Sequence, residues 1–211
     1  APGPDFNVES VARSLLTDRP DAEFETNGDL AGASVLPVLG CNSFLRDATL
    51  RCTGPEANHA RVLAFAETTF RRLHDVGAEF VVFGSNTARQ VPAGFPMDKA
   101  NEQFIALLRA MGPLAERYKI LVAVEPQRAV ECNFINHIAE AVAVVAPVDH
   151  PNIRVLADLY HMAVMGDTPA DLTRAMPWVG WVELAEKENR TIPGVAGDDF
   201  RPYFTALAAG G

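Results

Sequence analysis

The stretch Ile120-Leu121-Val122-Ala123-Val124-Glu125-Pro126 decides the fold class of this chain. A run of consecutive apolar residues is typical of a parallel strand that is buried on both faces. Glu125 follows directly, so its carboxylate must leave the core at the end of the strand or remain buried without a partner. Residues 153–157, followed by Asp158, repeat this arrangement. The sequence therefore predicts an α/β fold with acidic side chains at the carboxyl ends of its strands.

Short apolar runs alternate with longer helical patterns along the whole chain, which indicates one α/β domain over residues 1–211. The runs predict strands at residues 6–9, 35–42, 80–83, 120–124, 153–157 and 179–184. The helical patterns cover residues 58–76, 98–118, 136–145, 169–175 and 200–209. No linker or low-complexity segment interrupts this order.

The strand ends distinguish a closed barrel from a doubly wound sheet. No G-x-G-x-x-G turn follows an early strand, so the dinucleotide-binding fingerprint is missing. Polar or acidic residues instead follow several strands: Asn42, Ser85, Glu125, Asp158 and Glu183. A (β/α) barrel collects its chemistry at this end, because all strands point the same way. We therefore expect a TIM barrel, although about six strands are found where closure takes eight.

Composition excludes several classes of partner. The 211 residues carry a formal net charge of -9, which argues against nucleic acid. No apolar run approaches the roughly 20 residues that cross a bilayer, so we expect no membrane association. Three cysteines without paired spacing favour buried free thiols over disulfides. A cytoplasmic location is the default expectation, and a secreted or periplasmic one stays open.

Three acidic strand ends on consecutive βα units predict a metal site. Asp158 begins a D-x-x-H pattern that ends at His161, and alternation along residues 179–184 places Glu183 on the inner face. Such oxygen and nitrogen donors suit a divalent ion: Mn, Co, Mg, Fe or Zn. Glu131 and Arg190 follow strand ends by about six residues, within reach of a substrate above the metal. Taken singly, each residue is equally compatible with a solvated loop.

The stretch Glu125-Pro126 with Glu131-Cys132-Asn133-Phe134-Ile135-Asn136 resembles the E-P-x-x-x-x-E-C-N-x-I-N motif of sugar phosphate isomerase/epimerase proteins. The likeness continues through residues 157–162 and 186–191 and implies a xylose isomerase-like TIM barrel. It further implies that Glu125 binds the metal and moves a proton, and that Asp158 is a second ligand. By the same resemblance, His161, Glu131 and Arg190 contact the substrate. The implied activity is metal-dependent isomerisation or epimerisation of a ketose or keto-sugar through an enediolate.

Three features depart from that family. Glu183 stands where a histidine ligand is usual, Gln127-Arg128-Ala129 replaces an Asn-Arg pair, and the first and last barrel strands are not found. We expect the 211 residues to be part of a longer chain that supplies the second catalytic carboxylate. Lyase or hydrolase action on oxidised (3-keto) glycosides and a non-catalytic carbohydrate-binding role are the alternatives. The acidic charge counts against an apurinic endonuclease, and a homo-oligomer stays open.

Overall fold

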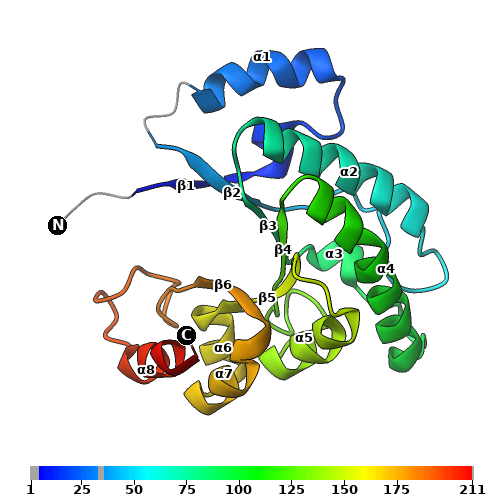
Figure 1. Cartoon of the computed structure of the whole chain (residues 1–211). Helices are drawn as coiled ribbons and strands as arrows, with labels where there is room; N and C mark the ends of the chain where they lie inside the picture. Colours follow the sequence, from blue (N-terminus) through cyan, green and yellow to red (C-terminus); the bar gives the residue numbers. More distant parts are fainter. Residues whose placement is uncertain (1–4, 33–35, 211) are drawn as a thin grey trace.

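The computed structural model describes residues 5–32 and 36–210, and in these its strands form one parallel sheet. Neighbours in the sheet are also neighbours in the chain, in the order β1-β2-β3-β4-β5-β6. The strands are β1 (Asn7–Ser10), β2 (Val38–Asn42), β3 (Phe80–Phe83), β4 (Leu121–Val124), β5 (Ile153–Asp158) and β6 (Val179–Glu183). Figure 1 shows these strands curving around a common axis, as six consecutive strands of a (β/α) barrel do.

Ring contacts across the concave face show how strongly the sheet curves. Phe80 on β3 and Trp181 on β6 lie three strands apart, yet their ring centroids are 4.1 Å apart. Strands spaced by about 4.8 Å would hold these positions about 14 Å apart in a flat sheet. Phe6, just before β1, also meets Trp181 with centroids 6.0 Å apart. The inner face is therefore folded on itself as in a barrel, with β1 and β6 approaching each other.

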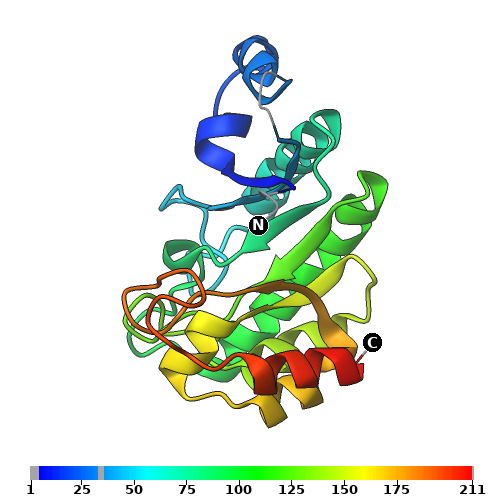
Figure 2. The same cartoon turned by 90° about the vertical axis from the view of Figure 1, so that its left-hand side faces the viewer.

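Helices cover the convex face in chain order (Figures 1 and 2). The longer ones are α1 (Asp21–Gly32), α2 (His59–Asp75), α4 (Met97–Arg117), α5 (Ile138–Val145), α7 (Pro169–Ala175) and α8 (Arg201–Gly210). The helix α6 (Leu159–Met165) is as long as α7, and the short turns are η1 (Val11–Leu15), α3 (Asn86–Arg89), η2 (Ala146–Val148) and η3 (Met176–Trp178). Contacts run from α2 to α4, α4 to α5, α5 to α7 and α7 to α8.

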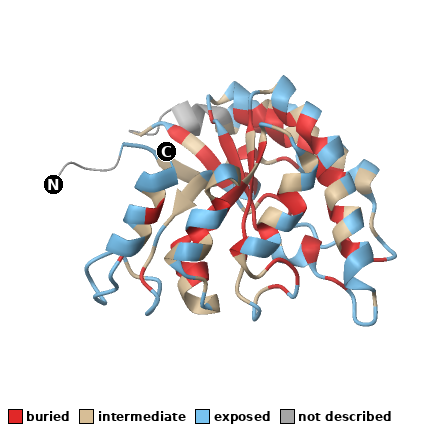
Figure 3. Cartoon of the chain, turned by 60° about the horizontal axis from the view of Figure 1, so that its bottom comes forward, coloured by how far each residue is buried: buried red, intermediate tan, exposed pale blue. Residues whose placement is uncertain are grey.

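The main apolar core lies between the sheet and these helices, where Figure 3 shows the buried residues concentrated. A second, smaller cluster on the concave face contains Phe80, Val82, Ala123 and Leu156. Burial is most complete on β3, β4 and β5, whereas all residues of β1 and nearly all of β6 are only half-buried. The three central strands, β3, β4 and β5, are therefore a firm support for the residues at their carboxyl ends.

The elements agree with the sequence-based expectations except for six short or weak helical segments. Each expected strand and helix is present with ends shifted by a few residues, although Val35 lies outside the described residues. The segments η1, α1, α3, η2, α6 and η3 were not expected. Asn27 and Gly28 lower the helix propensity of α1, and η1, α3, η2 and η3 span three to five residues, too few to show a period. The three cysteines are buried and free, as expected. Within the described residues, no helix is both long and apolar enough to span a bilayer.

Candidate active site

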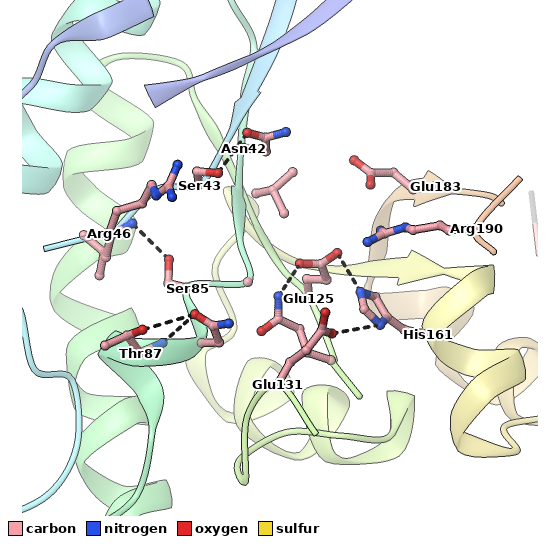
Figure 4. Close-up of a pocket in the computed structure, with 15 residues that line it drawn as sticks. Asn42, Ser43, Arg46, Ser85, Thr87, Glu125, Glu131, His161, Glu183 and Arg190 are labelled. Carbon is pink, nitrogen blue, oxygen red and sulfur yellow. Dashed lines mark hydrogen bonds and ion pairs between the residues drawn. The ribbon is translucent and has the colours of Figure 1, made fainter. Parts of the chain in front are cut away.

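A cavity of about 440 Å³ opens at the carboxyl ends of the strands. It is lined by polar residues from β2 to β6 and the loops that follow them: Asn42, Ser43, Arg46, Ser85, Asn86, Thr87, Glu125, Gln127, Glu131, His161, Glu183 and Arg190. Figure 4 shows Glu125, Glu131 and His161 converging, with Glu183 and Arg190 on the β6 side and Arg46 on the opposite wall. Such a lining suits a small polar ligand rather than an apolar one.

Glu125 is the most enclosed carboxylate that lines this cavity. It follows β4 directly and is only 6% exposed. The buried Arg89 donates a hydrogen bond to its backbone carbonyl at 3.0 Å, and Gln127 donates to its carboxylate at 3.2 Å. Burial, together with the charges of Asp158 and Glu183, raises the pKa of Glu125 to about 8. Its carboxyl group can therefore hold or release a proton near neutral pH.

Asp158 closes β5 and organises the short helix behind the cavity. Its Oδ1 accepts hydrogen bonds from the backbone amides of Tyr160 at 2.8 Å and His161 at 3.4 Å, so it caps α6. Its Oδ2 pairs with the guanidinium of Arg190 at 2.7 Å. The capping arrangement also fixes the backbone of His161, which lies in the first turn of α6.

His161 lies between three carboxylates. Its Nε2 is 3.5 Å from Asp158 Oδ2 and 3.6 Å from Glu125 Oε1, and its Nδ1 is 3.7 Å from Glu131 Oε2. These distances are too long for hydrogen bonds and leave room between the groups. Burial lowers the pKa of His161, which favours the neutral imidazole. A neutral ring with Nδ1–H toward Glu131 would present the Nε2 lone pair to the other two carboxylates.

Glu183 ends β6 opposite Asp158 in the strand register. Trp181 packs in the concave cluster and Val182 against the outer core, so the alternation expected from sequence holds and Glu183 lines the cavity. Burial and the charge of Asp158 raise the pKa of Glu183. The charge of Glu183 in turn helps to raise the pKa of Glu125.

Two guanidinium groups flank the aromatic ring of Tyr160. Arg190 lies 4.7 Å and Arg128 5.2 Å from the ring centroid. Arg128 also makes two hydrogen bonds to Glu131, at 2.7 and 3.2 Å, and this pairing lowers the pKa of Glu131. Glu131 is therefore kept ionised and can accept hydrogen bonds from a ligand.

The loop that carries Arg190 is organised around a buried carboxylate, Glu186. It accepts hydrogen bonds from the amides of Gly194, Ala196 and Gly197 and from the Thr191 hydroxyl. Burial alone would raise the pKa of Glu186, but these hydrogen bonds outweigh it and lower the pKa to about 2. Arg190 itself has a left-handed φ of 52°, a conformation that needs such support.

The donor groups of Glu125, Asp158 and His161 fit a divalent cation. Their ligand atoms all lie within 4.8 Å of one another, and all three residues are buried. Two carboxylates this close repel each other, and a cation between them would offset that repulsion. The sequence-based ligand set was Glu125, Asp158 and Glu183, whereas the structure gathers His161 with the first two and leaves Glu183 on the cavity wall. Glu131 and Arg190 line the cavity as the resemblance implies.

Sequence reasoning assigned no role in the site to three residues that shape it: Gly84, Arg89 and Gln127. A Cβ on Gly84 would lie 2.1 Å from the Glu125 carboxylate, so only glycine leaves that space. Arg89 is fully buried behind Glu125. Only Gly84 gave a usable signal, because a glycine directly after a buried strand suggests a close approach.

Comparisons with known proteins agree with this architecture. Residues 20–211 match the xylose isomerase-like TIM barrel family. The chain belongs to that family. A curated relative, D-psicose 3-epimerase of Agrobacterium fabrum, is 26% identical over 199 residues, covering 90% of this chain. The chain spans 66% of the length of that relative, just under two thirds.

Two solved structures show the same family fold. The 3-keto-D-glucoside 4-epimerase YcjR of E. coli has a TM-score of 0.76 at 22% identity, covering 98% of this chain and 78% of its own. The IOLI protein, whose crystal structure contains a bound zinc atom, has a TM-score of 0.75 at 16% identity, covering 98% of this chain and 76% of its own. Compared with the complete barrel of the family, the six parallel strands described here form a partial barrel, as expected from the sequence.

Proposed function

We propose that this protein is a divalent-metal-dependent isomerase or epimerase of a ketose or keto-sugar. The observation that carries the proposal is the cluster of Glu125, Asp158 and His161 at the barrel rim, beside a cavity that is lined mainly by polar groups and includes Glu125 and His161. A carbohydrate presents many hydroxyl groups, and carboxylates and amides are suitable partners for them. The sugar epimerases among the similar proteins support this reading.

The residues of the chain supply the elements of an enediolate mechanism. A divalent ion held by Glu125, Asp158 and His161 would polarise the adjacent carbonyl and hydroxyl oxygens of the sugar. Glu125, whose pKa is raised to about 8, would in its ionised form remove the proton from the hydroxyl-bearing carbon next to the carbonyl and hold it as the carboxylic acid. Glu131 and Arg190 orient the sugar hydroxyls above it. Glu183, with its raised pKa, is a second carboxyl group lining the cavity that could carry a proton.

Lyase action on an oxidised glycoside would use the same proton abstraction, so the reaction outcome depends on the substrate. The structural likeness to a 3-keto-D-glucoside 4-epimerase makes keto-glucosides a useful part of a substrate panel. A carbohydrate-binding protein without turnover would bind such sugars and exchange no proton.

Solvent deuterium uptake tests the proposal. D-Psicose, D-fructose and a 3-keto-glucoside are incubated in D₂O with the Mn²⁺-loaded protein, and incorporation is followed by NMR. We expect deuterium at the carbon next to the carbonyl of at least one sugar, and loss of at least about a hundredfold in rate for Glu125→Gln. Glu67→Gln, on the exposed face of α2, is the matched control and should exchange normally. Sugar binding without any exchange would refute the catalytic proposal.

A further inference from the structure

The proposed mechanism makes no use of the cavity wall that lies opposite Glu183 and Arg190 (Figure 4). The ends of β2 and β3 and the loops after them form this wall: Asn42, Ser43, Leu45, Arg46, Val82, Gly84, Ser85, Asn86 and Thr87. None of these nine lining residues is acidic, whereas the rest of the lining includes three carboxylates. The cavity is therefore electrostatically divided, with its negative charges on the β4 to β6 side and a cation, Arg46, across from them.

The charge of Arg46 is not balanced by any described residue. The side chain is exposed, and it makes no hydrogen bond or ion pair within the described part of the chain. The neighbouring Asp47 pairs instead with Arg61, at 3.3 Å. Arg190 on the far side of the cavity differs in this respect, because it is taken up by Asp158 at 2.7 Å. Arg46 is therefore a cation in the cavity lining that is available to a ligand.

Two further hydrogen-bond donors belong to the same wall. Ser85 Oγ accepts the backbone N–H of Leu45 at 3.0 Å, which ties the residue before Arg46 to the end of β3. The hydroxyl proton of Ser85 stays available to a ligand. Asn86 Oδ1 accepts the backbone N–H of Thr87 at 2.7 Å, so the Asn86 NH₂ group is the part of that amide left to donate. Ser85 also has a left-handed φ of 30°, a conformation that non-glycine residues adopt mainly at functional sites.

An anion matches this set of groups best. Guanidinium groups bind phosphate and carboxylate oxygens through charge-assisted hydrogen bonds. A neutral hydroxyl group could accept the same hydrogen bonds, but it would leave the charge of Arg46 unbalanced. The three carboxylates of the β4 to β6 side would repel an anionic group, whereas Arg46 would attract it. The carbonyl end of a sugar, in contrast, suits a divalent ion.

We propose that the substrate carries an anionic group, a phosphate ester or a carboxylate, at the end of the sugar remote from its carbonyl, and that Arg46 binds this group. Ser85 and Asn86 would donate further hydrogen bonds to it. The inference rests on the proposed function, because it places the carbonyl end of the sugar at the metal cluster. It narrows the substrate class to ketoses or keto-sugars that are phosphorylated or oxidised at the terminal carbon.

The test measures dissociation constants by titration calorimetry with Mn²⁺-loaded protein. The ligands are D-fructose, D-fructose 6-phosphate and D-fructuronate, which carries a carboxylate at the same terminal carbon. D-Fructose 1-phosphate has its phosphate beside the carbonyl and serves as the control for a phosphate that only coordinates the metal. Wild type is compared with Arg46→Gln and Arg46→Lys. Arg109→Gln, which removes an exposed arginine of α4 outside the cavity lining, changes the net charge equally.

We expect wild type to bind at least one of the two terminal anions about tenfold more tightly than D-fructose. Arg46→Gln should lose this preference, Arg46→Lys should keep part of it, and Arg109→Gln should keep all of it. Binding of D-fructose 1-phosphate should not depend on Arg46. A preference for D-fructose 6-phosphate alone would identify the group as a phosphate, and a preference for D-fructuronate alone would identify it as a carboxylate.

Three results would overturn the inference: no preference for either terminal anion, a preference that survives in Arg46→Gln, or an equal effect of Arg46→Gln on D-fructose 1-phosphate. Deuterium exchange, recorded in parallel for each sugar, separates this failure from that of the proposed function, which stands if any sugar exchanges. The expected preference without exchange into any sugar would support the inference and refute the epimerase proposal. If wild type binds none of the sugars, both are refuted.

Discussion

The two walls of the cavity on either side of Asp158 are built differently. On the β4–β5 wall, Glu125, Asp158 and His161 are at most 6% exposed, and each is held by its strand end or by the start of α6. On the β6 wall, Glu183 is half-buried and Arg190 stands on an exposed loop whose shape depends on Glu186. Among the side-chain hydrogen bonds of the described residues, one connects the two walls directly, and it joins Arg190 to Asp158.

This difference indicates a division of labour. Groups that share a cation must keep their positions within fractions of an ångström, which requires buried, capped strand ends. Groups that contact substrate hydroxyls can lie on a loop, where small movements admit and release a ligand. The buried wall therefore suits the metal and the proton transfer, and the loop wall suits substrate recognition.

Removing one carboxylate from each wall should give the largest difference in Mn²⁺ affinity. We expect Asp158→Asn to weaken Mn²⁺ binding by more than about a hundredfold, beyond the effect of an outer-shell change. Glu183→Gln should weaken it by less than about tenfold, because Glu183 lies outside the Glu125–Asp158–His161 cluster. Metal content after dialysis and direct Mn²⁺ titration measure both.

An equal loss in the two variants would show that Glu183 is a ligand, as the sequence alone suggested. His161→Gln then serves as the deciding variant. It should abolish binding if the imidazole completes the cluster and leave it intact if Glu183 does.

A methyl group placed behind the buried wall should reduce turnover, by a smaller factor than the loss of Mn²⁺ affinity expected for Asp158→Asn. In Gly84→Ala the new Cβ would lie 2.1 Å from the Glu125 carboxylate and displace it. Because only flexible side-chain ends are in the way, we expect the fold to persist. A displacement of a reacting group by about 1 Å reduces kcat by roughly tenfold to a hundredfold. The exchange rate and Tm are measured together, and a normal rate would show that Glu125 tolerates the shift.

The comparison of the walls also shows what could be read from the sequence. Glu125 and Asp158 were predictable, because each follows an apolar run that can only be a buried strand. Glu183 was placed on the inner face by the alternation of its strand. The distances around His161 were not predictable, because they depend on how the α6 turn is capped. Arg89 and Gln127 were missed, since their contacts with Glu125 come from the α3 segment and a loop without any periodic signal.

The smallest expected effects come from the loop wall. The Glu186 carboxylate accepts four hydrogen bonds through its two oxygens. In Glu186→Gln one of these oxygens is replaced by an NH₂ group, which cannot accept them. We expect a Tm about 5 °C lower at pH 7 and a few-fold lower kcat/KM through the displaced Arg190. Mn²⁺ affinity should change by less than about tenfold, because Asp158 loses only its Arg190 partner and keeps the two backbone amide hydrogen bonds that hold it at the start of α6.

The pH dependence of this variant distinguishes the carboxylate from the loop packing around it. The folded-state pKa of Glu186 is lowered to about 2 from an ordinary value of 4.5. Its stabilising contribution is therefore complete above pH 4.5 and is lost as the pH falls toward 2. The Tm difference between wild type and Glu186→Gln should shrink over that window. Thr191→Val, which removes only the neutral donor at 2.9 Å, should lower Tm by about 2 °C and keep the pH dependence of wild type. A constant difference for Glu186→Gln across the window would mean that packing, rather than the ionised carboxylate, maintains the loop wall.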